Sequence, residues 1–172
     1  MQNVDGKGNL SKRLLEIEKY DKTLIIFDAD KDYESNKKEI LKIVSKTKQI
    51  ISEEQIFLFP NNQDDGDLET LLLEIANHKE FINCFESYLD CIKKKEHYKP
   101  IKNIRKNMLY AYLEAFGLED LYTKKNIFDT EGKVKDQYKG DYEKLQEVIG
   151  FDSKSLVPLK NFLERSVENN QK

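Results

Sequence analysis

Cysteine and histidine are scarce in this chain, with two residues of each among 172. Cys84 and Cys91 stand in a segment whose pattern predicts a helix, which places them about 10 Å apart along the helix axis. That separation is too large for a disulfide bond. The two histidines, His78 and His97, have spacings unrelated to those of the cysteines, which argues against a zinc site. We therefore expect two ordinary thiols.

Long apolar runs are also missing. The longest contain only a few residues, whereas a helix that spans a bilayer needs roughly 20. The initial stretch MQNVDGKGNL has neither the basic nor the apolar region of a signal peptide. From these absences we expect no membrane segment and a cytoplasmic location.

Neither sign of charge is in strong excess. The chain has 29 Lys and Arg against 32 Asp and Glu, and its formal net charge is -3. This balance excludes a global basic field, which would indicate nucleic acid, and a strongly acidic disordered tail. Any charge that serves a function must therefore be local.

The length fits one ordinary domain with a helical appendage.

The first half of the sequence alternates between strand and helix patterns. The apolar run in TLIIFDADKD, residues 23–32, predicts a strand that is buried on both faces, and residues 55–59, QIFLF, predict a second strand. Residues 2–4 resemble the tail of another strand. Helical spacing predicts three helices: residues 10–17 capped at Asn9, residues 35–48, and one capped by Asp67. This order predicts a parallel sheet.

Helical patterns dominate from about residue 77 onward. Apolar stripes predict amphipathic helices over residues 81–92 and 101–116, and a last helix over residues 155–167. Residues 122–141 are polar and predict a loop or a short hairpin. The sequence thus predicts an α/β core over residues 1–77 and a mainly helical C-terminal extension, residues 78–172, packed on it.

Acidic residues follow both predicted strands. In an extended backbone, Asp28 and Asp30 point to the same side with α-carbons roughly 6.5–7 Å apart, so their carboxylates can converge on one ion. Ligands of open parallel sheets bind at the carboxyl ends of the strands, and Mg²⁺ prefers oxygen ligands, typically one or two carboxylates. After the second strand come further acids: Asp64, Asp65, Asp67 and Glu69.

The alternative for these acids is a structural role, because Asp favours strand-end turns and helix caps. We favour that interpretation for Asp32, Asp64 and Asp65. For Asp28 and Asp30, which directly follow an apolar strand, we favour a functional role over a structural one. For Glu69, which would also interact favourably with a helix dipole, the two interpretations are even.

Two stretches resemble a known family. The sequence IIFDADKD followed by IFLFPNNQDDGDLETLLLEI is similar to a Toprim domain, of the kind found in topoisomerases, primases and OLD-type nucleases. It most resembles a small group of uncharacterised bacterial Toprim-like proteins. NVDGKGNL resembles the glycine turn after the second Toprim strand. The resemblance covers about residues 1–77 and implies a Toprim-like parallel sheet core flanked by helices.

The resemblance also implies a nuclease-like activity. Asp28 and Asp30 match the Toprim metal-binding motif, and Glu69 stands at the late acidic position. It implies that these three residues are catalytic and that Asp28 and Asp30 bind Mg²⁺ or Mn²⁺ for phosphodiester chemistry on DNA or RNA. No residue matches the glutamate that ends the first Toprim strand and serves as general acid or base. We therefore expect either this activity or a catalytically weakened remnant of it.

Two alternatives remain open. FDAD also matches the nucleophile motif of haloacid-dehalogenase-type phosphatases, with Asp28 as nucleophile, although Asp32 stands where Thr or Val is usual. The other alternative is a noncatalytic module that binds nucleic acid or protein. It is based on the densest basic stretch, residues 93–106, which is otherwise typical of a solvated helix end. The residues predicted to contact phosphates are Lys93, Lys94, Lys95 and Lys99.

Overall fold

The computed structural model describes residues 6–123 and 127–168 of the chain. The predicted α/β class is confirmed: a parallel sheet is flanked by helices, and the remainder is mainly helical. The chain divides into two compact units, of which the first comprises residues 1–71 with 154–172 and the second residues 72–153. Residues 2–4, predicted as the tail of a strand, lie outside the described residues.

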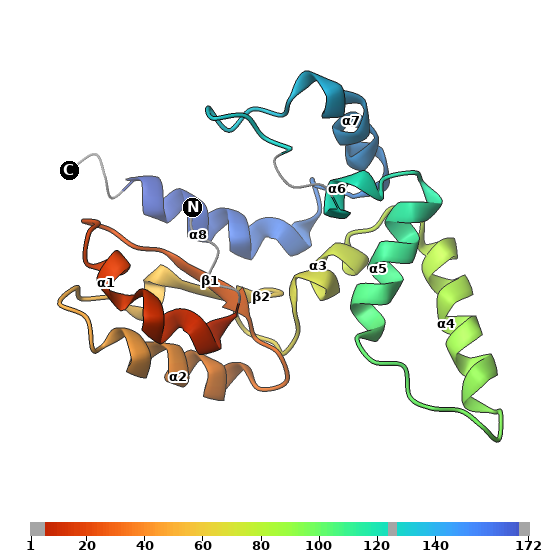
Figure 1. Ribbon diagram of the computed structural model, residues 1–172, viewed down its shortest axis with the longest axis horizontal. Coiled ribbons are helices and arrows are strands. Elements are labelled where there is room, and N and C mark those ends of the chain that lie inside the picture. The colour runs from red at the N-terminus through yellow and green to blue at the C-terminus, as the bar shows by residue number, and fades with distance from the viewer. Residues whose placement is uncertain (1–5, 124–126, 169–172) are drawn as a thin grey trace. The chain divides into compact units, whose positions relative to one another are not determined.

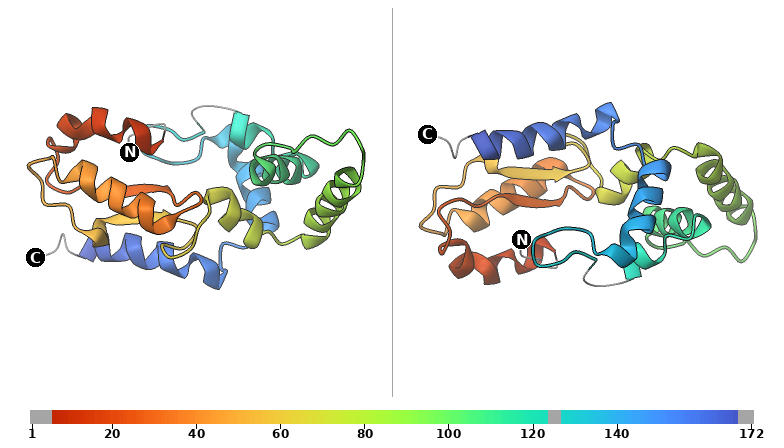
Figure 2. Two further views of the ribbon diagram at one scale, coloured as in Figure 1. Left: turned by 90° about the horizontal axis from the view of Figure 1, so that it is seen from below. Right: turned by 90° about the horizontal axis from the view of Figure 1, so that it is seen from above.

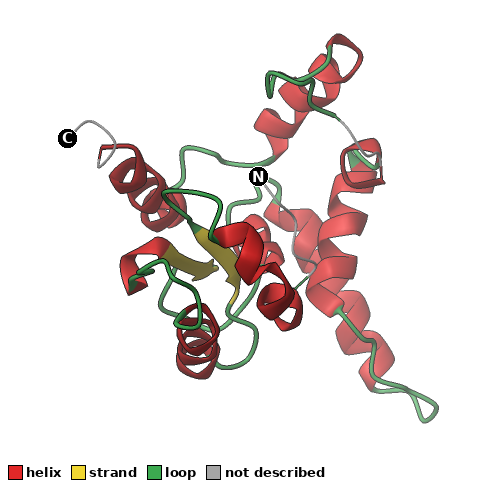
Figure 3. Cartoon of the chain, turned by 60° about the vertical axis from the view of Figure 1, so that its left-hand side comes forward, coloured by secondary structure: helices red, strands yellow, loops and turns green. Residues whose placement is uncertain are grey.

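The first unit is built on two parallel strands, drawn in yellow in Figure 3. Strand β1, Ile25–Asp28, pairs with strand β2, Ile56–Phe59, and Asp28 stands opposite Phe59. Helix α2, Tyr33–Val44, connects them, as a parallel pair requires. The 3₁₀ turn η2, Glu53–Gln55, leads into β2. The predicted strand, helix and strand are therefore confirmed.

Helices cover both faces of this sheet (Figures 1 and 2). One face packs against the 3₁₀ helix η1, Lys7–Arg13, helix α1, Leu14–Ile17, and α2. The buried cluster on that face contains Leu10, Ile17, Ile25, Ala29, Tyr33, Ile40, Val44, Ile56 and Leu58. Because side chains alternate along a strand, Phe57 of β2 points to the other face. There its ring centroid lies 5.3 Å from that of Phe162.

Phe162 belongs to helix α8, Val157–Glu168, which follows the 3₁₀ turn η4, Lys154–Leu156. The final helix is therefore confirmed, with a start two residues later than predicted. Its packing on β2 places it in the first unit, whereas the sequence assigned it to the extension beyond residue 77. The sequence pattern of α8 shows that one face is apolar but not which partner covers it.

Strand β1 is less buried than its sequence predicts. Ile26 is 39% exposed, whereas Ile56, Phe57 and Leu58 of β2 are fully buried. Within the described ranges β1 pairs only with β2, and the predicted burial on both faces is wrong for β1. The sequence does not distinguish the two cases, because a short apolar run occurs both in a partly exposed strand and in a fully buried one.

The first two helices start differently from the prediction. Asn9 lies inside η1 and not at a cap, and its side-chain oxygen accepts a hydrogen bond from Lys12 at 2.9 Å. Helix α2 starts at Tyr33, two residues earlier than predicted, because Asp32 caps it. Such side-chain caps replace the hydrogen bonds that the first N–H groups of a helix lack.

The second unit is mainly helical. Helix α3, Leu68–Glu74, spans the boundary between the units. Helices α4, Lys79–Lys93, and α5, Ile104–Ala115, lie side by side as a helical hairpin (Figures 1 and 2). After α6, Asp120–Thr123, a bridge joins Phe128 and Val134, and residues 124–126 lie outside the described part. The loop or short hairpin predicted over residues 122–141 is therefore correct only for its middle, because residues 122–123 and 136–141 are helical. The 3₁₀ turn η3, Asp136–Tyr138, and helix α7, Lys139–Val148, complete the unit.

A buried hydroxyl connects the helices of the second unit. The Tyr112 hydroxyl of α5 donates to the Val148 carbonyl at 2.6 Å and accepts from the His78 N–H at 3.3 Å. It thereby joins α5 to the end of α7 and to the start of α4.

Among the helices of the described residues, none combines the length and the apolar character needed to cross a membrane.

Candidate functional site

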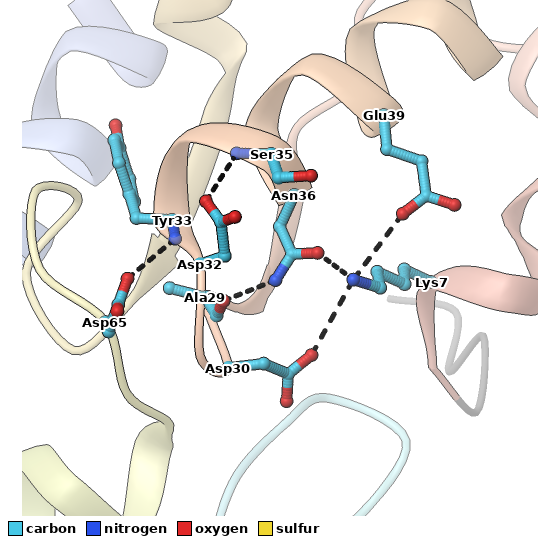
Figure 4. A network of polar contacts seen from close by, with 9 residues as sticks. All are labelled: Lys7, Ala29, Asp30, Asp32, Tyr33, Ser35, Asn36, Glu39 and Asp65. Atoms are coloured by element: carbon cyan, nitrogen blue, oxygen red, sulfur yellow. Dashed lines mark hydrogen bonds and ion pairs between the residues drawn. The ribbon is translucent and has the colours of Figure 1, made fainter.

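Two acidic residues cap the start of helix α2. Asp32 Oδ1 accepts a hydrogen bond from the Ser35 N–H at 2.9 Å, and Asp65 Oδ1 accepts one from the Tyr33 N–H at 2.7 Å (Figure 4). A carboxylate at this position replaces a missing backbone partner and interacts favourably with the helix dipole. The structural role expected for Asp32 and Asp65 is therefore confirmed.

Helix α3 receives two carboxylates in the same way. Asp67, the predicted cap, accepts from the Thr70 N–H at 2.8 Å and from the Thr70 hydroxyl at 2.5 Å. Asp28, at the end of β1, accepts from the Leu68 N–H at 3.0 Å, although the two residues are 40 positions apart. This contact gives a structural reason for a carboxylate directly after an apolar strand.

Asp30 has a backbone conformation that the sequence did not indicate. Its φ of 56° is left-handed, so the chain is not extended beyond β1 and the predicted alignment of the Asp28 and Asp30 side chains is wrong. The Asp30 N–H donates to the Gly66 carbonyl at 2.7 Å. At Gly66 itself, φ is 148° and a β-carbon would lie 3.0 Å from Pro60 Cδ. Only glycine permits this close approach.

An ammonium group from η1 stands beside Asp30 (Figure 4). Lys7 Nζ lies 3.8 Å from Asp30 Oδ2 and 3.5 Å from Glu39 Oε2, and it donates to Asn36 Oδ1. Asn36 is 7% exposed, and its Nδ2 donates to the Ala29 carbonyl. The chain's own lysine therefore supplies positive charge at this edge.

Sequence reasoning missed both Lys7 and Asn36. Asn36 stands four residues before Ile40 on the apolar stripe of α2, and a polar residue at such a position is a signal that it has a buried partner. Lys7 lies in a glycine turn, where nothing distinguishes it from a solvated lysine.

The three predicted site residues come to one edge of the sheet. Burial is the largest effect that raises the pKa of Asp28, and the hydrogen bond from the Leu68 N–H opposes it. The charges of Glu69, Asp67 and Asp30 raise the pKa of Asp28 further. Glu69 is therefore an electrostatic neighbour of Asp28.

These residues do not fit a complete metal centre. In the described part of the chain, no three side chains of His, Cys, Asp or Glu are grouped so as to hold a metal ion. One oxygen of Asp28 is used by the Leu68 N–H, and Asp30 turns toward Lys7. Two carboxylates engaged in this way leave most of a Mg²⁺ coordination shell to water.

Asp28→Asn should raise the melting temperature by a few degrees at pH 7 in EDTA. Asparagine removes a charge that burial and nearby acids disfavour, and its oxygen still accepts from Leu68. A folded-state pKa above the ordinary 3.8 means that ionisation of Asp28 destabilises the fold as the pH rises through that interval. The gain should therefore be complete above the folded-state pKa and disappear as the pH falls below 3.8.

Melting curves of both proteins at several pH values test this expectation. Asp21→Asn, a change at an exposed aspartate, is the matched control and should have little effect. A melting temperature of Asp28→Asn at or below that of the native chain at pH 7 would contradict the assigned electrostatics.

The predicted basic stretch forms the exposed connection between α4 and α5. Residues 93–106 contain seven Lys and Arg and one acid, Glu96, for a formal charge of +6, whereas the whole chain has -3. Lys93 Nζ pairs with Asp90 at 3.3 Å. Among the described residues, none of the other predicted contacts has a carboxylate within ion-pair distance. All four predicted contacts are exposed: Lys93, Lys94, Lys95 and Lys99.

The fold and these features define an α/β protein whose strand-end acids cap helices and whose helical hairpin has a basic connection. The sequence matches one family model over residues 2–168, described as protein of unknown function (DUF3226). The match covers almost the whole chain, so the chain belongs to this family. No curated protein and no solved structure matches it.

Proposed function

We propose that this chain is a Toprim-like protein that binds nucleic acid and whose acidic edge is a catalytically weakened remnant of a metal-dependent phosphodiester site. The observation that carries the binding function is the exposed charge of +6 in residues 93–106 of a chain whose total charge is -3. Phosphates attract such a cluster strongly, because each contact releases condensed counterions from the nucleic acid.

The Toprim-like part of the proposal is supported by the order of the elements and by the acids. Asp28 ends the first of two parallel strands, Asp30 follows it, and Glu69 follows the second strand. This is the edge at which parallel sheets bind ligands. The weakened activity is supported by the hydrogen bond to Asp28 and by the ion pair of Asp30 with Lys7.

In this proposal the acidic edge binds Mg²⁺ or Mn²⁺ weakly, with a dissociation constant of about a millimolar, because water supplies most ligands. Calorimetry with Mn²⁺ should show that Asp28→Asn combined with Asp30→Asn abolishes binding. Lys7→Met should strengthen it, because Lys7 Nζ lies beside Asp30. The control is Lys12→Met, since Lys12 donates to the side-chain oxygen of Asn9 and makes no ion pair with a carboxylate among the residues that the structure describes. Mn²⁺ binding that is unchanged in the double variant would refute the metal site.

The functional test combines binding and cleavage on one preparation. We expect the protein to retain a fluorescent oligonucleotide in EDTA, with an affinity that falls as salt rises, and to cleave it slowly or not at all in Mn²⁺. Efficient cleavage that Asp30→Asn abolishes would show an intact nuclease. Cleavage that survives Asp30→Asn would place the site elsewhere, and phosphate release from small phosphomonoesters that depends on Asp28 would favour the phosphatase.

The cytoplasm is the compartment that we propose for this function. Both cysteines, Cys84 and Cys91, are free and exposed. Free thiols are typical of the reducing cytoplasm, where DNA and RNA are also available.

A further inference from the structure

An apolar pocket lies between helices α4 and α5. Its volume is about 300 Å³, at the lower end of the range for sites of small ligands. Three of its seven lining residues are aromatic, and the others are apolar or carry a thiol. The lining consists of Phe81, Ile82, Cys84, Phe85, Met108, Ala111 and Tyr112.

Aromatic side chains continue from this pocket toward the basic connection. Phe81 is 42% exposed and Tyr88, two turns later on α4, is 53% exposed. Between them, the Phe85 ring meets the Tyr88 ring edge to face, with centroids 6.1 Å apart. Helix α4 ends at Lys93, about 12 Å along the axis from Phe85 at 1.5 Å per residue. Helix α4 thus contributes to an aromatic pocket, presents an exposed ring and then leads into the lysines of the basic connection.

We infer that the ligand of this hairpin is single-stranded nucleic acid, with one unstacked base in the α4–α5 pocket and the adjacent phosphates on the basic connection. The inference rests on the proposed function and names its substrate class. A single strand offers flat bases with exposed π-faces and a polyanionic backbone within a few ångströms of each other, and proteins bind it by aromatic stacking along a positive groove.

Charge and shape together select this occupant. The formal charge of +6 in residues 93–106 selects a polyanion over a neutral apolar ligand. Bases in a duplex are stacked and paired, so that they cannot enter a pocket, whereas those of a single strand are accessible. An acidic peptide meets the charge requirement but lacks flat rings spaced along its backbone.

The first experiment compares a labelled single-stranded oligonucleotide with the duplex of the same sequence. Phe85→Ala should weaken binding of the single strand about 5- to 150-fold, the range for the loss of one stacked base, and leave duplex binding unchanged. Phe151→Ala, at an exposed aromatic outside the pocket lining, is the control and should affect neither. Thermal melting confirms that the variants are folded.

The second experiment leaves the aromatic residues unchanged and measures the reactivity of the two cysteine thiols. Cys84 lines the pocket, whereas Cys91, two turns closer to the lysines on the same helix, does not. In Cys91→Ser and Cys84→Ser chains, alkylation by iodoacetamide reports each remaining thiol separately. A saturating single strand should slow the reaction of Cys84 at least tenfold and that of Cys91 much less. The duplex should leave Cys84 reactive.

The outcomes separate the two proposals. If no oligonucleotide binds, the proposed function and this inference both fail. If single strand and duplex bind equally and Cys84 stays reactive, the binding function stands and the base pocket is refuted. Displacement of a bound single strand by a polyglutamate peptide at equal charge concentration would also refute the base pocket, since charge alone would then determine binding.

Discussion

Lys93→Glu together with Lys94→Glu should weaken the binding of a single-stranded oligonucleotide more than tenfold at about 50 mM salt. Both side chains are exposed, Lys93 at the end of α4 and Lys94 directly after it, and each reversal replaces attraction to a phosphate with repulsion. For single strands the logarithm of the affinity falls with the logarithm of salt by about 0.7 per phosphate contact. Two lost contacts should therefore reduce the slope by about 1.4.

A matched pair of reversals separates a local surface from net charge. Lys154→Glu with Lys160→Glu changes two other exposed lysines and gives the same change in formal charge, from -3 to -7, since each reversal subtracts two. Fluorescence anisotropy at several salt concentrations measures both pairs. An equal loss of affinity in the two double variants would show that binding depends on the net charge of the chain and not on the position of the lysines. Neither pair should lower the melting temperature much, because exposed ion pairs contribute little.

Phe57→Ala should lower the free energy of unfolding by about 3–5 kcal/mol, as expected for truncation of a buried phenylalanine. The Phe57 side chain is fully buried, and its ring centroid lies 5.5 Å from that of Phe59 and 5.3 Å from that of Phe162. The substitution removes this packing and leaves a cavity between β2 and α8.

Urea unfolding followed by circular dichroism measures the loss. Phe57→Leu, which keeps most of the volume, should cost much less, and Phe151→Ala, at an exposed ring, should cost little. Hydrogen exchange adds a local readout, because amides of α8 should exchange faster in Phe57→Ala. A loss below about 1 kcal/mol, well under the usual cost of such a cavity, would show that α8 does not pack on β2.

Local sequence patterns predicted the elements whose causes are local. The apolar runs gave β1 and β2, helical spacing gave α4, α5 and α8, and Asp67 was recognisable as a cap because its partner Thr70 is three residues away. Local pattern does not report what covers an element. For that reason, the partial exposure of Ile26 in β1 and the packing of α8 on β2 were not predictable.

The candidate site was predictable in composition but not in geometry. Asp28, Asp30 and Glu69 do come to one edge of the sheet, which follows from their places after parallel strands. The left-handed backbone at Asp30 and the hydrogen bond from Leu68 to Asp28 depend on how distant segments meet. The contacts of Lys7 depend on the same long-range arrangement.

The caps of α2 and α3 also couple the folding of the two strand–helix halves. Asp65 comes from the loop after β2 and completes the start of α2, whereas Asp28 comes from the end of β1 and completes the start of α3. Each helix thus lacks one of its end partners until the opposite half has docked. This reciprocity favours a cooperative transition, in which the two halves form together and open together.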